Sequence, residues 1–510
     1  MALPTRVLQI LESGEVPKAK IVEGAGRNEQ YVALSYCWGK AETHHGLKTT
    51  TANLLIHKEG IDFESLFQTL RDAVQIAKGL GFRFLWIDAL CIVQDDDDDW
   101  NREAAMMCQV YSNAALTLIA SGSSCSSEGV FRYQDYSRAR TVGYKDSFVH
   151  VRPDLSRDHS NSYNLDYDDE PFSARAWTLQ KAVLSNRALL FTQRELKWLC
   201  NEWRKCECAS LCSRLDTEDA GDPRAFRLRS LFEQQDLDEA YRKWQNIVEM
   251  FSRRQLSFDS DRLTALSGLA HRFADMLQDC FDRPDTYRAG LWEGHLPAAL
   301  LWETGEDRDF QSVDLKRLTR RPRSWRAPTW SWASLEAPVL YPPFIGLAYK
   351  VKVAACSTTT RTGDPYGQIL HGALTLVGTV LHGLSMDTIL PERQSDAGLP
   401  RWHSDGLIGS TMSFRRGHTH KLRMYDLDLC YITHDCDTDL LRDIDSLIAV
   451  IVGHQKIADE HLLLILRKIA NGGGAFERLG LAIFRPNESH HRPAISGFID
   501  NSPTEEIVVV

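Results

Sequence analysis

Hydrophobic and polar positions along the first third of the chain follow two alternating periods. Short apolar runs predict strands, and apolar residues at helical spacing between them predict helices. The predicted strands are residues 31–36, 84–92, 115–120 and 188–192, and the predicted helices are residues 66–79 and 100–111. The run from Phe84 to Ile92 is apolar almost throughout, which is typical of a strand buried on both faces. The alternation predicts an α/β fold with a doubly wound, mostly parallel sheet.

The period changes twice more along the chain. Residues 238–253 and 262–278 carry apolar stripes at helical spacing, whereas short β-type runs separated by Gly and Asp follow residue 346. Such β-type runs favour an antiparallel sandwich or barrel. We therefore expect three parts: an α/β domain over residues 1–215, a helical region over 216–345 that completes its core, and a β-rich C-terminal domain over 346–510. Residues 121–170 have little periodicity and are expected to form an insertion or lid.

Composition narrows the class of protein. Hydrophobic residues make up 43% and charged residues 25% of the chain, as in ordinary globular proteins. The net charge of -10 argues against a broad nucleic-acid surface, which needs clustered Lys and Arg. No stretch approaches the roughly 18 apolar residues of a membrane span, and no long apolar segment opens the chain. We expect a cytoplasmic protein that binds neither nucleic acid nor membrane.

The twelve cysteines predict neither a disulfide framework nor a metal site. Cys37, Cys91 and Cys430 lie inside apolar runs and are expected to be buried thiols in a reducing compartment. A tighter group has the spacing C-x5-C-x-C-x3-C, which departs from the paired knuckles of structural zinc. Its members are Cys200, Cys206, Cys208 and Cys212. Ordinary thiols are the favoured reading for this group.

An acidic run, Asp95–Asp99, stands directly before the helix expected from Trp100. Carboxylates there can cap free backbone N–H groups and meet the positive end of the helix dipole. A metal site is the alternative, but the spacing lacks the alternate ligands and central glycine of a calcium loop. We therefore expect capping, with Asp95 as the residue best placed for another role.

Polar and aromatic residues follow the first two predicted strands. They are Ser35, Tyr36, Trp38, Asp88, Cys91 and Gln94. In an open α/β sheet the carboxyl ends of the strands border the ligand crevice, so these side chains are expected to line one pocket. Ser35, Tyr36, Trp38 and Gln94 would bind the ligand, with an aromatic face for contact area and polar groups for orientation. Packing of Trp38 against the next helix is the alternative.

Asp88 and Cys91 are the candidate reactive groups, with Arg175 as an anchor for a phosphate or carboxylate. A carboxyl group within an apolar run is costly to bury unless it is paired. Asp88 could therefore serve as acid or base, or form a structural ion pair with an arginine such as Arg175. Cys91 could be a nucleophile, although a lone cysteine in an apolar strand is more often inert.

Three further segments complete the pattern. Arg175–Gln180 contains Trp177 and Gln180, which we also expect at the ligand site. Asp261–Gly268 and Arg326–Trp332, which contains Trp330 and Trp332, are expected to pack in the core between the helical region and the α/β domain. Together with Tyr31–Gly39 and Phe84–Asp95, in this order, these segments resemble the fungal heterokaryon incompatibility (HET) domain family. The resemblance covers roughly residues 30 to 335.

The resemblance implies an α/β domain distantly similar to Toll/interleukin-receptor domains, acting in fungal non-self recognition and programmed cell death. Proteins of that wider class include some that cleave NAD, so it also implies a possible nucleotide-cleaving activity. The chain departs from the family at Lys181, where the family pattern usually continues with Glu after Gln180. The following Leu184–Arg187 matches the pattern again.

Two other functions stay open at this point. No P-loop or repeat accompanies the HET-like segments, so the chain could be a stand-alone enzyme of fungal secondary metabolism: a cyclase, dehydratase, isomerase or hydrolase. It could also be a non-catalytic interaction scaffold. We expect no metal or redox cofactor, because no metal-ligand cluster or dinucleotide fingerprint is found in the sequence. The expected partners are a small-molecule ligand or substrate and a second copy of the chain.

Overall fold

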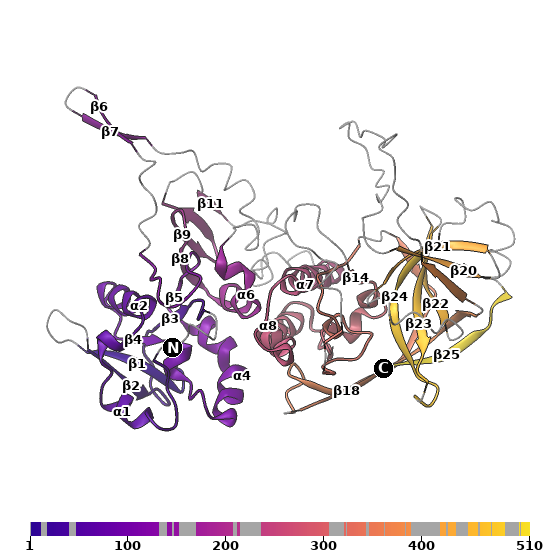
Figure 1. Cartoon of the computed structure of the whole chain (residues 1–510), viewed down its shortest axis with the longest axis horizontal. Coiled ribbons are helices and arrows are strands. Elements are labelled where there is room, and N and C mark those ends of the chain that lie inside the picture. The colour runs from indigo at the N-terminus through magenta and orange to yellow at the C-terminus, as the bar shows by residue number, and fades with distance from the viewer. Residues whose placement is uncertain are drawn as a thin grey trace. The chain divides into compact units, whose positions relative to one another are not determined.

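The computed structural model of the chain contains two compact units, Met1–Asp285 and Thr286–Val510 (Figure 1). The boundaries expected at residues 215 and 345 stay a prediction. The structure describes residues 2–11, 18–39, 47–131, 140–144, 147–151, 170–207, 212–214, 236–304, 321–322, 324–342, 346–361, 363–382, 384–388, 419–424, 427–434, 447–456, 460–470, 472–484, 499 and 501–510.

A nine-stranded mixed sheet organises the first unit, in the order β11-β10-β9-β8-β5-β3-β4-β1-β2. Its strands are β1 (Arg6–Leu11), β2 (Lys18–Glu23), β3 (Val32–Ser35), β4 (Phe84–Trp86), β5 (Leu116–Ile119), β8 (Arg187–Phe191), β9 (Leu196–Cys200), β10 (Trp203–Cys206) and β11 (Cys212–Arg214). A separate hairpin joins β6 (Arg140–Tyr144) to β7 (Ser147–Val151).

Only the centre of this sheet is parallel. Strands β8, β5, β3 and β4 run parallel to one another, whereas β1 and β2 on one side and β9 to β11 on the other pair antiparallel. The sheet is thus mixed rather than mostly parallel. Only residues 192–195 separate β8 from β9, which is too short for the crossover that a parallel pair needs.

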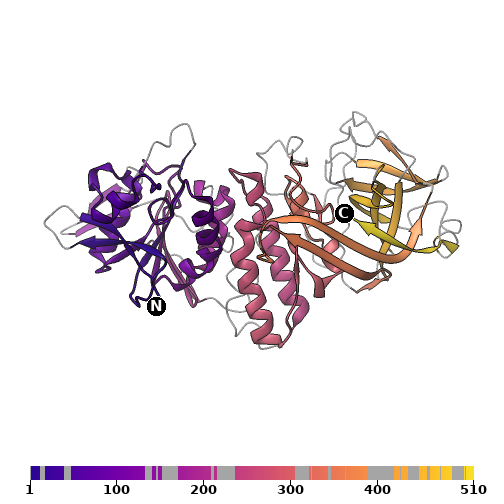
Figure 2. The same ribbon diagram turned by 90° about the horizontal axis from the view of Figure 1, so that it is seen from below.

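Helices lie on both sides of this sheet, as Figure 2 shows for the indigo-to-magenta part of the chain. They are α1 (Leu54–Glu59), α2 (Gln68–Gly79), α3 (Asp88–Cys91), α4 (Asp97–Asn113) and α6 (Ala176–Leu184). On one face, Leu70 and Val74 of α2 share a core with Val32 and Leu34 of β3. On the other face α4 and α6 cover the sheet; the Tyr111 ring of α4, for example, meets the Trp86 ring of β4 at 5.7 Å.

The second predicted strand is shorter than its apolar run. Strand β4 ends at Trp86, and the chain turns into the helical segment α3 at Asp88. The turn forms because the Asp88 carboxylate accepts a hydrogen bond from Ala89 N, while Cys91 N donates to Ile87 O. Asp88 therefore lies just after the end of β4, and not in the middle of a strand as the sequence predicted.

The acidic run caps helix α4, as predicted. The Asp96 side chain accepts hydrogen bonds from the backbone N–H groups of Asp98 and Asp99, so the helix begins at Asp97. Asp95 stands apart, because its carboxylate accepts hydrogen bonds from Thr51 N and Thr51 Oγ1. The acidic residues before α4 therefore serve local structure.

Two longer helices, α7 (Leu237–Ser252) and α8 (Thr264–Phe281), complete the first unit. Helix α8 packs against α4 and α6. Gly268 permits the close approach, because a Cβ at this position would lie 2.9 Å from Cys108 Cβ and 3.0 Å from Gln180 Cδ. Helical structure among the described residues of the expected 216–345 region is confined to α7, α8 and short 3₁₀ turns.

The second unit is rich in β-structure. Its elements include β12 (Tyr287–Arg288), β13 (Leu291–Trp292), β14 (Glu303–Thr304), β15 (Val339–Leu340), β16 (Leu347–Tyr349), β17 (Lys352–Thr360), β18 (Ile369–Leu381), β19 (Leu384–Thr388), β20 (Thr419–Met424), β21 (Leu427–His434), β22 (Leu447–Gln455), β23 (Glu460–Lys468), β24 (Phe476–Phe484) and β25 (Thr504–Val509). Short 3₁₀ turns precede and follow β14, among them Ala298–Leu300 and Trp332–Ser334.

Five strands of this unit pair in a closed ring. Strand β22 pairs with β18, β18 with β25, β25 with β24, β24 with β23, and β23 again with β22. Closure gives each strand two neighbours, as in a small barrel. None of the described strands from β16 onward pairs with the sheet of the first unit.

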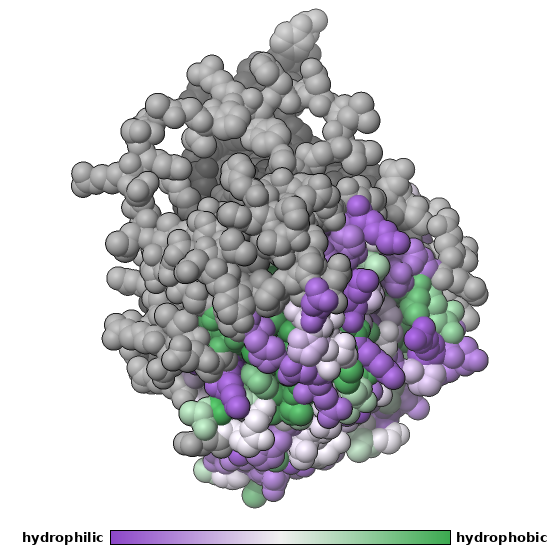
Figure 3. All heavy atoms as spheres, turned by 90° about the vertical axis from the view of Figure 1, so that its right-hand side faces the viewer, coloured by the Kyte–Doolittle hydropathy of each residue, from purple (hydrophilic) through white to green (hydrophobic). Residues whose placement is uncertain are grey.

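On the face drawn in Figure 3, the coloured residues mix hydrophilic and hydrophobic side chains, as is usual for a water-exposed surface.

The two tryptophans of the last motif segment lie in the core of the second unit. Trp330 and Trp332 are fully buried. Trp302 Nε1 donates a hydrogen bond to Trp330 O, and Trp332 Nε1 donates one to Gly290 O, both at 3.1 Å. Both residues therefore pack in a core, as expected, but these contacts lie within the second unit and not between the helical region and the α/β domain, where the sequence predicted them.

Candidate functional site

A buried ion pair lies at the carboxyl ends of the parallel strands. Lys181 Nζ donates to Asp88 Oδ2 at 2.8 Å, and the side chains are only 6% and 8% exposed. Asp88 Oδ1 also accepts hydrogen bonds from Trp38 Nε1 at 3.1 Å and from Ala89 N at 2.8 Å. Donors therefore face both oxygens of this carboxylate, which compensates much of the cost of burying it.

Three elements bring these groups together. Trp38 follows β3, Asp88 follows β4, and Lys181 is carried by α6 across the end of the sheet. Because β3 and β4 are parallel neighbours, the residues that leave them meet at one edge. We call Tyr36, Trp38, Asp88, Tyr111 and Lys181 the Asp88 cluster.

Two tyrosines complete the cluster. Burial, and then the neighbouring Asp88 carboxylate, raise the pKa of Tyr36 and of Tyr111 well above the usual value. Both phenols therefore keep their protons at neutral pH and can donate hydrogen bonds. Tyr111 donates to Leu34 O at 3.0 Å, and its ring lies 5.7 Å from Lys181 Nζ. The aromatic ring gives the ammonium group a second favourable contact.

Arg175 stands at the edge of this cluster. It precedes the first residue of α6, and its backbone is fixed by hydrogen bonds between Ala176 N and Gln255 O and between Gln255 N and Ala174 O. Its half-buried guanidinium acts on Tyr36 and Cys37: burial raises the pKa of the Cys37 thiol, and Arg175 lowers it in part. The guanidinium thus lies beside the end of β3, where an anionic ligand could meet it.

Two other predicted binding residues brace the backbone. Gln94 Nε2 donates to Asp88 O at 3.0 Å and to Ile92 O at 3.1 Å, which holds the segment after α3. Gln180 Oε1 accepts from Gly268 N at 2.9 Å, so it ties α6 to α8. Gln94 is half-buried, whereas the side chain of Gln180 is enclosed between helices. Gln180 does not face the Asp88 carboxylate.

The remaining predicted residues have distinct surroundings. Ser35 is fully buried beside the Tyr111 hydroxyl. Trp177 contacts the Trp100 ring at 6.2 Å and hydrogen-bonds Asp261 of the fourth motif segment. Burial raises the pKa of the Cys91 thiol to about 12. A thiol with this pKa is almost entirely protonated at neutral pH, so burial does not favour Cys91 as a nucleophile.

Sequence reasoning missed three contributors to this site. Lys181 was noted only as a departure from a family pattern, and Tyr111 was not singled out. A serine-rich loop, Ser121–Gly129, follows β5 and supports Trp38, since Ser126 Oγ donates to Trp38 O at 3.2 Å. The position of this loop after a central parallel strand was the available signal.

Strand β1 also supports the site from outside the motif segments. Arg6 Nε donates to Cys91 O at 2.8 Å, and the guanidinium pairs with Asp99. Burial acts to raise the pKa of Asp99, but hydrogen bonds from Arg6 and Val93 N outweigh it, so the pKa is lowered overall. The N-terminal strand is thereby tied to α3 and α4.

Within the described residues, no three His, Cys, Asp or Glu side chains come together as metal ligands would. Cys208 lies outside the described residues, and only the backbone of Cys212 is described. The expectation about cofactors therefore stays a prediction. In the same part of the chain, every helix is too short or too polar to cross a membrane.

Comparison with known proteins identifies the domain that holds this cluster. The model of the family described as heterokaryon incompatibility protein (HET) matches residues 31–181. No curated protein and no solved structure matches the chain. The matched range runs from Tyr31 to Lys181, so it includes every member of the Asp88 cluster. Residues 31–181 are a HET domain, from a family whose function is heterokaryon incompatibility, a form of fungal non-self recognition.

Proposed function

We propose that this protein acts in fungal non-self recognition and cell-death signalling, and that the Asp88 cluster is the working centre of its HET domain. One observation carries the proposal: three residues far apart in the sequence, two of them in motif segments and one directly after a third segment, meet at a single carboxylate. These residues are Trp38, Asp88 and Lys181. A buried, fully hydrogen-bonded charge of this kind is costly to assemble, which favours a role beyond simple packing.

The half-buried residues around the carboxylate suit a nucleotide-type ligand. Trp38 offers an aromatic face, and Arg175 offers a planar guanidinium for a phosphate group. The Asp88 carboxylate could stabilise the positive charge that develops on a ribosyl group as its glycosidic bond breaks. We therefore propose cleavage of an NAD-type nucleotide as the chemical activity of this site.

Lys181 sets a condition on that activity. Its ammonium group neutralises Asp88 in the structure, so the carboxylate can act on a ligand only after Lys181 has moved away. The same saturation of Asp88 favours a second candidate function. In that alternative, the cluster is a purely structural core, and the HET domain signals through its surface as a non-catalytic scaffold.

The proposal can be tested by inducible expression in a filamentous fungus, with cell viability and intracellular NAD as the readouts. We expect the wild-type chain to kill cells and lower NAD, and Asp88→Asn to abolish both at equal protein level. Asp88→Asn keeps the size of the side chain and removes its charge. Glu59→Gln is the matched control, because Glu59 is exposed at the end of α1.

The two candidate functions predict different results. Loss of NAD on incubation with the purified wild-type protein, but not with folded Asp88→Asn, would support nucleotide cleavage. Cell death with unchanged NAD would favour the scaffold. If Asp88→Asn kills cells as efficiently as the wild type, the cluster is not the working centre.

A further inference from the structure

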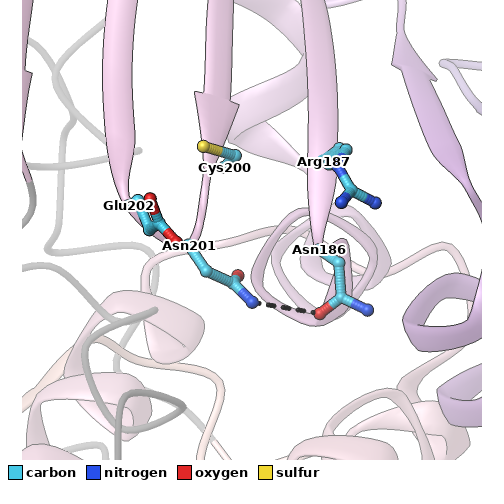
Figure 4. A pocket seen from close by; sticks show the side chains of 5 residues that line it. All are labelled: Asn186, Arg187, Cys200, Asn201 and Glu202. Carbon is cyan, nitrogen blue, oxygen red and sulfur yellow. Dashed lines mark hydrogen bonds between the residues drawn. The ribbon is translucent and has the colours of Figure 1, made fainter. Parts of the chain in front are cut away.

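A pocket of about 490 Å³ opens in the first unit at a place that the proposed function does not use (Figure 4). It is lined by Asn186, Arg187, Cys200, Asn201 and Glu202. Asn186 and Arg187 lie where α6 passes into β8, and the other three lie where β9 turns into β10. Pockets that hold small molecules measure ~300–1,000 Å³, so this volume suits a small ligand.

The pocket lies at the opposite end of the sheet from the Asp88 cluster. Arg187 is the first residue of β8, which runs parallel to the central strands, whereas the cluster lies beyond their carboxyl ends. The contact of Asn186 agrees with this position, since its Nδ2 donates to Ser112 O near the end of α4 at 2.5 Å. A ligand here would not compete with one at Asp88.

The walls of the pocket are held by the backbone pairing of β8 with β9. Arg187 pairs directly with Cys200, so their side chains share one face of the sheet. Asn201 Nδ2 donates to Asn186 Oδ1 at 3.4 Å, a contact that spans the two walls (Figure 4). Cys200 Sγ accepts a hydrogen bond from Trp203 N at 3.2 Å, which fixes the turn.

Two opposite charges in this pocket have no partner within the described part of the chain. The guanidinium of Arg187 and the carboxylate of Glu202 form no hydrogen bond or ion pair there, and both residues are exposed. Arg187 and Glu202 stand on different walls in Figure 4. A guanidinium favours a planar carboxylate, and a carboxylate with a nearby amide oxygen favours an ammonium group.

We propose that this pocket binds a zwitterionic small molecule of the amino-acid type. The carboxylate of the ligand pairs with Arg187, and its ammonium group pairs with Glu202. A doubly negative phosphate fits less well, because Glu202 would repel it. The first unit would then carry a ligand site at each end of its nine-stranded sheet, and the amino-end site would respond to a free amino acid.

Calorimetric titration of the full chain with each of the twenty standard amino acids tests this site. Acetate and ethylammonium, which carry one charge each, serve as half-ligands. We expect at least one amino acid to bind with a Kd of about 1 mM or tighter, and both half-ligands to bind at least ten-fold more weakly. Arg187→Gln and Glu202→Gln should each weaken binding at least ten-fold, whereas Glu59→Gln should not change it.

Cysteine alkylation locates the ligand. The amino acid that binds should slow modification of Cys200 by iodoacetamide, followed by mass spectrometry, and leave the half-buried Cys125 and Cys280 unaffected. Absence of binding by all twenty amino acids would overturn the proposal. So would binding that survives both charge-removing variants, or protection that does not include Cys200.

Discussion

The charged residues at the two ends of the nine-stranded sheet differ in burial and in pairing. At the carboxyl ends, Asp88 and Lys181 are buried and paired, and the carboxylate also accepts hydrogen bonds from Trp38 Nε1 and Ala89 N. At the amino ends, Arg187 and Glu202 are exposed and have no partner in the described residues. The buried pair at the carboxyl ends contributes to the stability of the fold, whereas the exposed charges at the amino ends remain available to a ligand. Mutations at the two ends should therefore differ sharply in their effect on stability.

The largest effect is expected when one partner of the buried pair is removed. Lys181→Met leaves Asp88 buried without its counter-charge and should lower the free energy of unfolding by about 3–5 kcal/mol. Lys58→Met is the matched control, because Lys58 pairs with Glu23 at 2.6 Å on the surface. Its cost should stay below about 1 kcal/mol. Urea denaturation of both variants measures the difference. Equal losses would show that the buried pair contributes no more to stability than the surface pair.

The next effect concerns the helix contact that holds α6 over the cluster. Gly268→Ala places a methyl group 2.9 Å from Cys108 Cβ and 3.0 Å from Gln180 Cδ, so α8 must shift. We expect a loss of about 1–3 kcal/mol in stability. Gly79→Ala in α2 is the control, since its Cβ would meet no atom within 4 Å. That variant should be neutral or gain up to about 1 kcal/mol. An unchanged free energy of unfolding in Gly268→Ala would show that α8 can accommodate a methyl group beside Cys108 and Gln180.

A smaller effect is expected from alkaline pH. The pKa of Tyr36 is raised in the folded state, so the folded protein holds this proton above the pH of about 10 at which an unfolded tyrosine releases it. The stabilising contribution is complete below pH 10 and is lost as the pH rises further. Tyr36→Phe should therefore lose less stability than wild type between pH 9 and pH 11 in urea denaturation. Tyr349→Phe, at an exposed tyrosine, should behave like wild type.

The smallest effect is expected at the amino ends. Arg187→Gln and Glu202→Gln remove charges that pair with no described residue, so each should change the free energy of unfolding by less than about 0.5 kcal/mol. Thermal unfolding scans of both variants check this expectation. A loss above about 1 kcal/mol in either variant would mean that the charge supports the fold and is not held free for a ligand.

Local patterns along the chain predicted much of this fold. The apolar runs gave β3, β4, β5 and β8, and the helical spacing gave α2, α4, α7 and α8. Such local patterns do not determine which distant strands pair or in which direction, so the antiparallel strands at both sides of the sheet were not predicted. The end of β4 was also missed, because the apolar run continues past Trp86 to Ile92 and is interrupted only by Asp88.

Two of the predicted site residues meet as expected, whereas the contacts that were predicted among the others differ in the structure. Trp38 and Asp88 do meet, because the ends of parallel strands converge. The expected structural partner of Asp88 was Arg175, whereas Lys181 takes that place. Arg175 directly precedes α6 and Lys181 lies on it, so which of them reaches Asp88 depends on how α6 packs across the sheet. That packing is a tertiary property that the spacing of residues does not reveal.

A double-mutant cycle measures whether Asp88 and Lys181 act as one unit at the carboxyl ends of the sheet. The free energy of unfolding of the first unit is measured by urea denaturation for wild type, Asp88→Asn, Lys181→Met and the double variant. We predict a coupling energy of at least about 2 kcal/mol, with the double variant more stable than the sum of the single losses implies. Additive losses, within about 0.5 kcal/mol, would show that Asp88 and Lys181 contribute to stability independently of each other.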